Sequence, residues 1–195
     1  MSKPSNLHRF RMSKTKKNSM HPRSKDVAIV ALMGALGNVL ATMTTYLGAI
    51  HPQIAIDLSH LATFIVAIYR GPMMGAMVGA IVSLEPFYRF GIAGWLGPIV
   101  GLTFIPGKAM TGYFAGIFAK RMRPIFAVLL GYVPESIFTY ITLKYLTMLL
   151  LPQIAPFFTD AIIFTILAKA WMEILFLGFL MEIIARNKAV KQWLS

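Results

Sequence analysis

The sequence predicts an all-α, polytopic membrane protein, a bundle of six transmembrane helices with both termini in the cytoplasm. Of its 195 residues, 57% are hydrophobic and 13% are charged, whereas about 25% of the residues in a soluble domain are charged. Six apolar stretches follow one another along the chain, as expected for membrane spans. The Lys and Arg residues between these stretches fall mostly on one predicted side of the membrane.

Residues 1–25 are expected to form a disordered, basic cytoplasmic tail ahead of a membrane domain at 26–195. Eight of the nineteen Lys and Arg residues lie in this tail, with no acidic residue among them. The tail has few large apolar side chains with which to fold. We interpret it as a positive-inside anchor and predict no nucleic-acid partner, with RNA or lipid headgroup binding as the alternative. Met12 and Met20 are alternative start positions.

The six predicted spans differ in length. The second and third have 16 residues each, which gives a helix of about 24 Å for a hydrocarbon core of about 30 Å. We expect them to thin the bilayer or to form a re-entrant hairpin. Pro98 and Pro106 are expected to bend the fourth span. The spans are Val27–Leu47, Ile54–Tyr69, Pro72–Phe87, Trp95–Ala119, Ile125–Leu151 and Phe158–Ala185.

The distribution of basic residues predicts the orientation of the chain. With the N-terminus inside, fifteen Lys and Arg residues lie on the cytoplasmic side and only Arg89 lies outside. The other three, Lys108, Lys144 and Lys169, fall within spans. This positive-inside bias predicts cytoplasmic termini in a cell (plasma) membrane protein.

Four charged residues are predicted near the middle of the membrane, where each costs about 2.5–3.5 kcal/mol on insertion scales. They are Lys108, Glu135, Lys169 and Glu173. Lys169 and Glu173 are four residues apart and are expected to pair. We interpret the four as a substrate-binding site, with structural ion pairing as the alternative. Lys144, on the other side of its helix from Glu135, is expected to snorkel.

Further polar and aromatic residues complete the predicted binding site. Asn38 begins a polar stripe with Thr42 and Thr45 that must face protein or water. The other candidate substrate-binding residues are His51, Trp95 and Tyr140.

Other charged and histidine side chains are predicted near the outer surface of the membrane, where a functional role is not required to explain them. For Asp57, Glu85, Arg89 and Asp160, exposure of the charge to water at the membrane surface is the alternative to a functional role. His51, Asp57 and His60 have a spacing compatible with zinc or nickel, but we predict no metal site and no cofactor.

Small residues are spaced for close helix packing. Gly71, Gly75 and Gly79 share one face of the third span, for packing within the bundle or for a dimer contact. Ala31 and Ala35 share a face of the first span and are candidate partner-docking residues.

No catalytic motif is present. The chain lacks the G-x-x-x-x-G-K-[ST] phosphate loop, H-E-x-x-H and G-x-S-x-G, and it has no cysteine. We therefore predict that it is not an enzyme and does not hydrolyse ATP itself.

Several short motifs resemble those of one transporter family. They are Ala28–Ala35, Asp57-Leu58-Ser59, Gly71-Pro72 with Gly75 and Gly79, and Gly107-Lys108 with Thr111-Gly112-Tyr113. Over roughly residues 26–186, the chain resembles the substrate-binding S components of energy-coupling factor (ECF) transporters.

The resemblance implies a high-affinity, membrane-embedded binding subunit of an ATP-driven importer for a water-soluble vitamin or related micronutrient. Its implied partners are a transmembrane coupling protein, on which Ala31 and Ala35 pack, and two ATPase subunits. The ligand pocket is then expected toward the outer side, near the 48–53 loop. The Asp57-Leu58-Ser59 and Gly71-Pro72 motifs lean toward the riboflavin-like branch.

Two other functions are compatible with the residues alone. One is a stand-alone small transporter or channel that acts as a dimer, with Gly71, Gly75 and Gly79 at the contact and the interior charges as an ion path. The other is a membrane scaffold whose charges are purely structural.

Overall fold

The computed structural model describes residues 24–50, 57–187, 189 and 192. Residues 1–23 of the predicted tail and residues 51–53 of the 48–53 loop, His51 among them, lie outside these described residues. Ser24 and Lys25 belong to the first turn of helix α1 (Ser24–Ile50).

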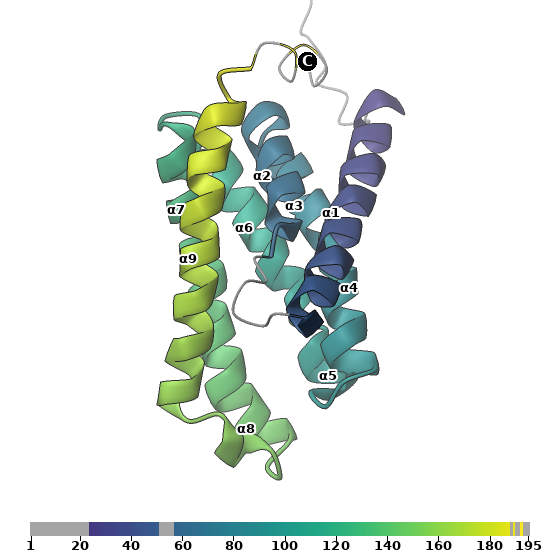
Figure 1. Ribbon diagram of the computed structural model, residues 1–195, viewed down its shortest axis with the longest axis vertical. Helices are drawn as coiled ribbons and strands as arrows, with labels where there is room; N and C mark the ends of the chain where they lie inside the picture. Colours follow the sequence, from purple (N-terminus) through teal and green to yellow (C-terminus); the bar gives the residue numbers. More distant parts are fainter. Residues whose placement is uncertain (1–23, 51–56, 188, 190–191, 193–195) are drawn as a thin grey trace, which may run out of the picture.

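The part of the chain that the structure describes is all-helical and contains no strand (Figure 1). The predicted all-α helical bundle is therefore confirmed. After α1 the elements are α2 (Ser59–Arg70), α3 (Pro72–Val82), α4 (Leu84–Pro86), the π-helix η1 (Phe87–Ile92), α5 (Gly97–Gly101), α6 (Phe104–Phe118), α7 (Pro124–Ile141), the π-helix η2 (Thr142–Leu146), α8 (Thr147–Leu150), the 3₁₀-helix η3 (Ala155–Phe157) and α9 (Asp160–Ile184).

Three helical stretches among the described residues are long and apolar enough to cross a membrane unaided. They are Ser24–Tyr46, Pro124–Leu150 and Asp160–Ile184. The shorter α2, α3 and α6 have 12, 11 and 15 residues, so the predicted second, third and fourth spans are built from shorter or interrupted helices.

The prediction that two prolines bend a continuous helix in the fourth span is wrong. The helix is instead interrupted at Leu102 and Thr103, between α5 and α6. Pro98 lies in the first turn of α5 and Pro106 in the first turn of α6. A proline is tolerated in a first turn because the N–H that it lacks would have no partner within the helix there.

The glycine face of α3 packs against α6 within the same chain. A Cβ atom on Gly79 would collide with the backbone of Lys108, and one on Gly112 would collide with the backbone of Gly75. Gly116 fits against Pro72 in the same way. Because α6 already covers this face, Gly75 and Gly79 are not available for the dimer contact that a stand-alone channel would need.

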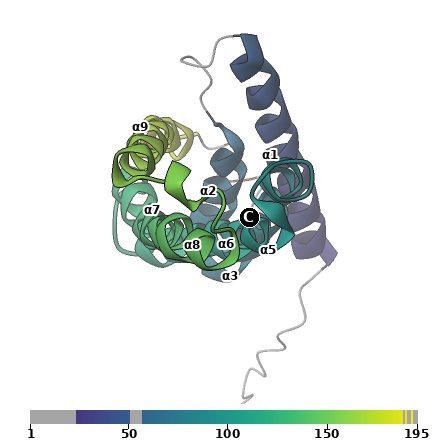
Figure 2. The same cartoon turned by 90° about the horizontal axis from the view of Figure 1, so that it is seen from below.

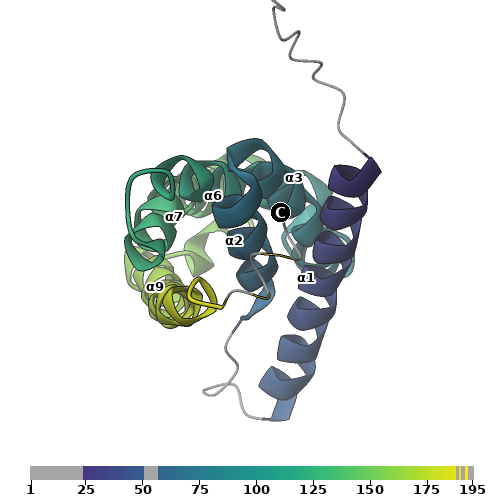
Figure 3. The same ribbon diagram turned by 90° about the horizontal axis from the view of Figure 1, so that it is seen from above.

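Helix α1 lies at one edge of the bundle, on the side opposite α9 (Figures 2 and 3). It packs on α2, α3 and α4 through a face of buried apolar and small residues. Gly34 of this face adjoins Ile81, and Gly37 adjoins Val82. The opposite face of α1, which carries Ala31 and Ala35, is exposed.

The start of α1 and the end of α9 lie at the same end of the molecule, the top of Figure 1. The Tyr69 hydroxyl donates to the carbonyl oxygen of Ile184 at 3.2 Å. Arg70 forms an ion pair with Asp26. These contacts join α1, α2 and α9 at one end of the bundle.

Candidate functional site

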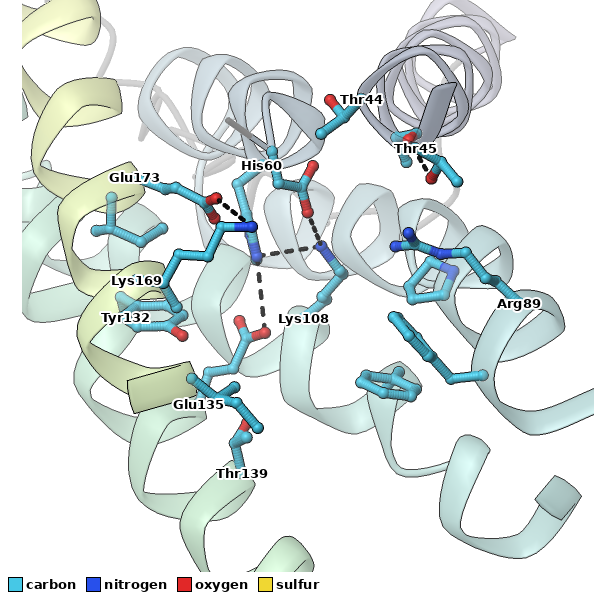
Figure 4. A pocket seen from close by; sticks show the side chains of 18 residues that line it. Thr44, Thr45, His60, Arg89, Lys108, Tyr132, Glu135, Thr139, Lys169 and Glu173 are labelled. Atoms are coloured by element: carbon cyan, nitrogen blue, oxygen red, sulfur yellow. Dashed lines mark hydrogen bonds and ion pairs between the residues drawn. The ribbon is translucent and has the colours of Figure 1, made fainter. Parts of the chain in front are cut away.

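A cavity of about 460 Å³ opens between the helices, next to the start of α2. Its walls come from α1, α2, η1, α6, α7 and α9. Figure 4 shows charged and hydroxyl side chains from these elements directed toward its centre. The segments around the cavity are far apart in sequence, so only the folded bundle forms it.

Lys108 lies at the centre of a buried polar cluster. Its ammonium donates to the Ser59 hydroxyl at 2.9 Å and lies 3.1 Å from Nε2 of His60. The carboxylate of Asp57 is 3.7 Å away. Asp57 also accepts a hydrogen bond from the backbone N–H of Ser59 at 2.8 Å, which fixes the start of α2. The Lys108 charge is therefore compensated by groups at the beginning of α2.

Glu135 of α7 lies below this cluster and is also buried. Its Oε2 accepts a hydrogen bond from the hydroxyl of Thr111. Its Oε1 lies 3.7 Å from Nε2 of His60. The polar cluster thus extends from α2 through α6 to α7.

Lys169 and Glu173 form the predicted ion pair on α9, with 3.8 Å between Nζ and Oε1. The Lys169 side chain is 58% exposed and that of Glu173 is 16% exposed, so this pair lies nearer the mouth of the cavity than Glu135. Both residues line the cavity.

On the wall opposite α9, Asn38 links α1 to α3 and α4, and we call these contacts the Asn38 bracket. Asn38 donates to the carbonyl oxygen of Ile81 at 2.8 Å and accepts from the N–H of Glu85 at 2.9 Å. Glu85 in turn accepts from Thr45 at 3.2 Å and lies 3.1 Å from Nε of Arg89. Arg89 and Thr45 line the cavity, whereas Asn38 acts behind it.

Aromatic rings complete the lining. Tyr132 packs edge-on against Trp171 with 5.2 Å between ring centroids, and against His60 with 6.1 Å. Phe90 and Phe104 pack together at 5.8 Å. A cavity that combines rings with a few polar groups is typical of small-molecule sites.

The structure brings together the four interior charges predicted from the sequence, because Lys108, Glu135, Lys169 and Glu173 all line the cavity. Their role in substrate binding stays a prediction, as do the roles of the other candidates. The described ones among them, Asn38, Trp95 and Tyr140, do not line the cavity.

Trp95 stacks on Phe158 at 5.4 Å, outside the cavity lining, and Tyr140 donates to Asp160 at 3.1 Å. Lys144 lies 2.9 Å from Asp160. Asp160 therefore has close partners where simple solvation was the competing explanation. The same holds for Asp57, Glu85 and Arg89, which all form ion pairs.

Several residues of the site had no substrate-binding role in the sequence analysis. They are Asp57, His60, Arg89 and Tyr132. The Asp57-Leu58-Ser59 motif was the available signal, because an Asp side chain often accepts from the backbone N–H two residues later, as Asp57 does from Ser59. The motif does not reveal that Asp57 and Ser59 meet Lys108. No described group of three or more His, Cys, Asp and Glu residues is arranged to hold a metal ion.

Comparison with known families agrees with this architecture. A sequence model of the family described as "ECF transporter, substrate-specific component" matches residues 25–185. The chain belongs to this family of ECF transporter S components. No curated protein sequence and no solved structure gives a significant match to it.

Membership places this S component in a membrane, in agreement with its long apolar helices. An S component is the substrate-specific part of a transporter and works with the ECF module, a coupling protein and ATPases. This is a class of binding subunit and not a class of enzyme. It also explains how a chain without a phosphate loop can serve in transport.

Proposed function

We propose that this S component is the high-affinity binding subunit of an ATP-driven importer for a water-soluble vitamin or related micronutrient. The observation that carries the proposal is the cavity of about 460 Å³ lined by both ion pairs and aromatic rings. Its size is within the range of about 300–1,000 Å³ found for sites that enclose small organic molecules. Its polar groups suit a water-soluble ligand better than a lipid.

The exposed face of α1 supports docking to a coupling protein. Ala31 and Ala35 lie one turn apart on this face, and small residues allow a second helix to approach closely. Large apolar residues flank them, with Leu32 at 61% and Leu36 at 44% exposure. We propose that the coupling protein packs here, on the side of the bundle opposite α9.

The distribution of charge supports cytoplasmic termini in the plasma membrane. Arg70 and Arg123 form ion pairs at the same end of the bundle as the start of α1 and the end of α9. A positive end of this kind favours the cytoplasmic side. With that orientation, the cavity mouth near Lys169 faces the outer half of the membrane.

Identifying the molecule that purifies with the protein tests the proposal directly. The full chain would be purified in detergent from cells grown in rich medium, denatured, and its released small molecules identified by mass spectrometry. We expect one stoichiometric vitamin or vitamin precursor. An empty protein whose thermal stability also fails to respond to a panel of vitamins and precursors would contradict a binding function.

Reconstitution tests the energy source. The S component would be placed in liposomes with and without a coupling protein and its ATPases. Uptake of the identified molecule would be followed with ATP, with a non-hydrolysable ATP analogue, and without nucleotide on the side of the ATPases. Uptake is expected only with the module and hydrolysable ATP. Uptake by the S component alone would favour the stand-alone transporter.

A further inference from the structure

The basic side chains that line the cavity each have an acidic partner. Arg89 pairs with Glu85 at 3.1 Å, Lys108 with Asp57 at 3.7 Å, and Lys169 with Glu173 at 3.8 Å. Within each of these three pairs, the positive and the negative charge cancel. They leave one acidic residue of the lining to be accounted for, Glu135.

Glu135 has no ion pair with Lys or Arg among the described residues. Its side chain is 10% exposed, so water compensates its charge only weakly. One carboxylate oxygen, Oε2, accepts the hydroxyl proton of Thr111. The other oxygen, Oε1, lies 3.7 Å from Nε2 of His60.

His60 does not supply a hydrogen bond to that second oxygen. The ammonium of Lys108 is a donor only and lies 3.1 Å from the same Nε2. Nε2 must therefore be the acceptor of that contact, with the ring proton on Nδ1. A nitrogen that accepts from Lys108 has no proton to give to Glu135. Oε1 of Glu135 thus lines the cavity without a donor from the described residues.

We propose that the ligand carries a positively charged nitrogen, as a protonated amine or a cationic ring, and that Glu135 is its counter-ion. This inference rests on the proposed binding function and specifies the class of substrate. A ligand cation would supply the charge and the hydrogen-bond donor that Oε1 lacks. An anionic ligand would meet the same oxygen with repulsion.

The neighbouring rings fit the same chemistry. Tyr132 is three residues before Glu135 on α7, so both side chains fall on the same face of the helix and both line the cavity. A cation held by a carboxylate beside an aromatic ring also gains from the ring quadrupole. Charge and ring are then recognised by one turn of α7.

Matched probes test the charge of the ligand. The full chain, purified in detergent, would be titrated with two cations and their uncharged analogues, pyridoxamine with pyridoxine and thiamine with thiochrome, followed by neutral riboflavin and anionic pantothenate. Binding would be measured by calorimetry and by thermal shift. The wild-type protein is expected to bind a cationic probe most tightly and to prefer it to its own uncharged analogue by at least about 10-fold.

Glu135→Gln tests the counter-ion, since it keeps the size and removes the charge. The affinity for the preferred cation is expected to fall by at least about 30-fold, as for loss of one partner of a buried charge pair. Glu182→Gln is the matched control, because Glu182 pairs with Arg123 and Arg186 near the end of α9, outside the cavity. It is expected to leave the affinity unchanged.

The outcomes separate this inference from the proposed function. A neutral or anionic probe that binds most tightly, or an equal affinity in the Glu135→Gln variant, overturns the cationic ligand while a binding function stands. If no probe of any charge binds, both fall. Should Glu135→Gln fail to fold, the selectivity of the wild-type protein within each matched pair still decides the inference.

Discussion

The ammonium nitrogen of Lys108 lies 3.1 Å from Nε2 of His60, although 48 residues separate them in the chain. Together with Ser59 and Asp57, this contact joins the start of α2 to the middle of α6. We predict that Lys108→Met lowers the free energy of unfolding by about 1–3 kcal/mol, because it removes the donor to the buried side chains of Ser59 and His60. Thermal unfolding of the purified protein in detergent measures this.

The control is Lys169→Met, which removes the other cavity lysine. Lys169 is 58% exposed and pairs only within its own helix, so the expected loss is below about 1 kcal/mol. Equal losses in the two variants would contradict a structural role for Lys108. The same two variants also test the substrate-binding hypothesis, since unchanged ligand affinity in both would exclude these lysines from ligand recognition.

The packing of α3 on α6 leads to a second prediction. Gly79→Ala is expected to destabilise the protein by about 1–3 kcal/mol through overpacking, because the added methyl group would meet the backbone of Lys108 rather than a movable side chain. It would also push Lys108 away from His60. Unfolding temperature and ligand affinity are both expected to fall.

Gly107→Ala gives the matched comparison on α6. A Cβ there would meet only side-chain atoms of Glu135 and Phe138, at ordinary contact distances of 3.6 Å or more. Alanine is a better helix former than glycine by about 1 kcal/mol, so stability should be kept or slightly increased. If Gly79→Ala proved as well tolerated as Gly107→Ala, the close approach of α3 and α6 would be wrong.

The sequence predicted most of this fold because hydrophobic length and charge are local properties. The first, fifth and sixth spans correspond to long helices with nearly the predicted ends. The four charges predicted near the middle of the membrane also line one cavity, since the cost of a buried charge depends little on where its partner lies in the sequence.

The parts that could not be predicted depend on contacts between distant segments. Nothing local to Asp57 or His60 indicates that Lys108, about 50 residues later, would lie between them. The interruption at Leu102 and Thr103 was also missed, because both residues are compatible with a helix and neighbouring prolines gave a stronger local signal. Trp95 and Tyr140 were chosen for their residue types, which do not specify the direction in which a side chain points.

The bracket made by Asn38 leads to a third prediction. Asn38→Leu removes its bonds to Ile81 and Glu85 and takes a hydrogen-bond partner from two half-buried backbone groups, at an expected cost of about 1–3 kcal/mol. Because Glu85 also holds Arg89 at the cavity wall, ligand affinity should fall although Asn38 itself does not line the cavity. Thr42→Val is the control, since Thr42 is exposed and donates only within α1. A loss of stability in the control equal to that in Asn38→Leu would remove the bracket as the cause.

Docking through α1 leads to the last prediction, which separates binding from transport. In the double variant Ala31→Leu and Ala35→Leu, the larger side chains should prevent close approach of the coupling protein. Ligand affinity should be kept, because both alanines are exposed on the side of α1 away from α2 and α3. ATP-dependent uptake in liposomes containing the ECF module is expected to fall at least about 10-fold, as for a loss of about 1.4 kcal/mol of docking energy. Ala168→Leu enlarges an exposed alanine on α9, across the bundle from α1, and should leave uptake unchanged. If it reduced uptake as strongly as the double variant while binding persisted in both, the coupling protein would contact α9 as well, and α1 alone would not define the docking surface.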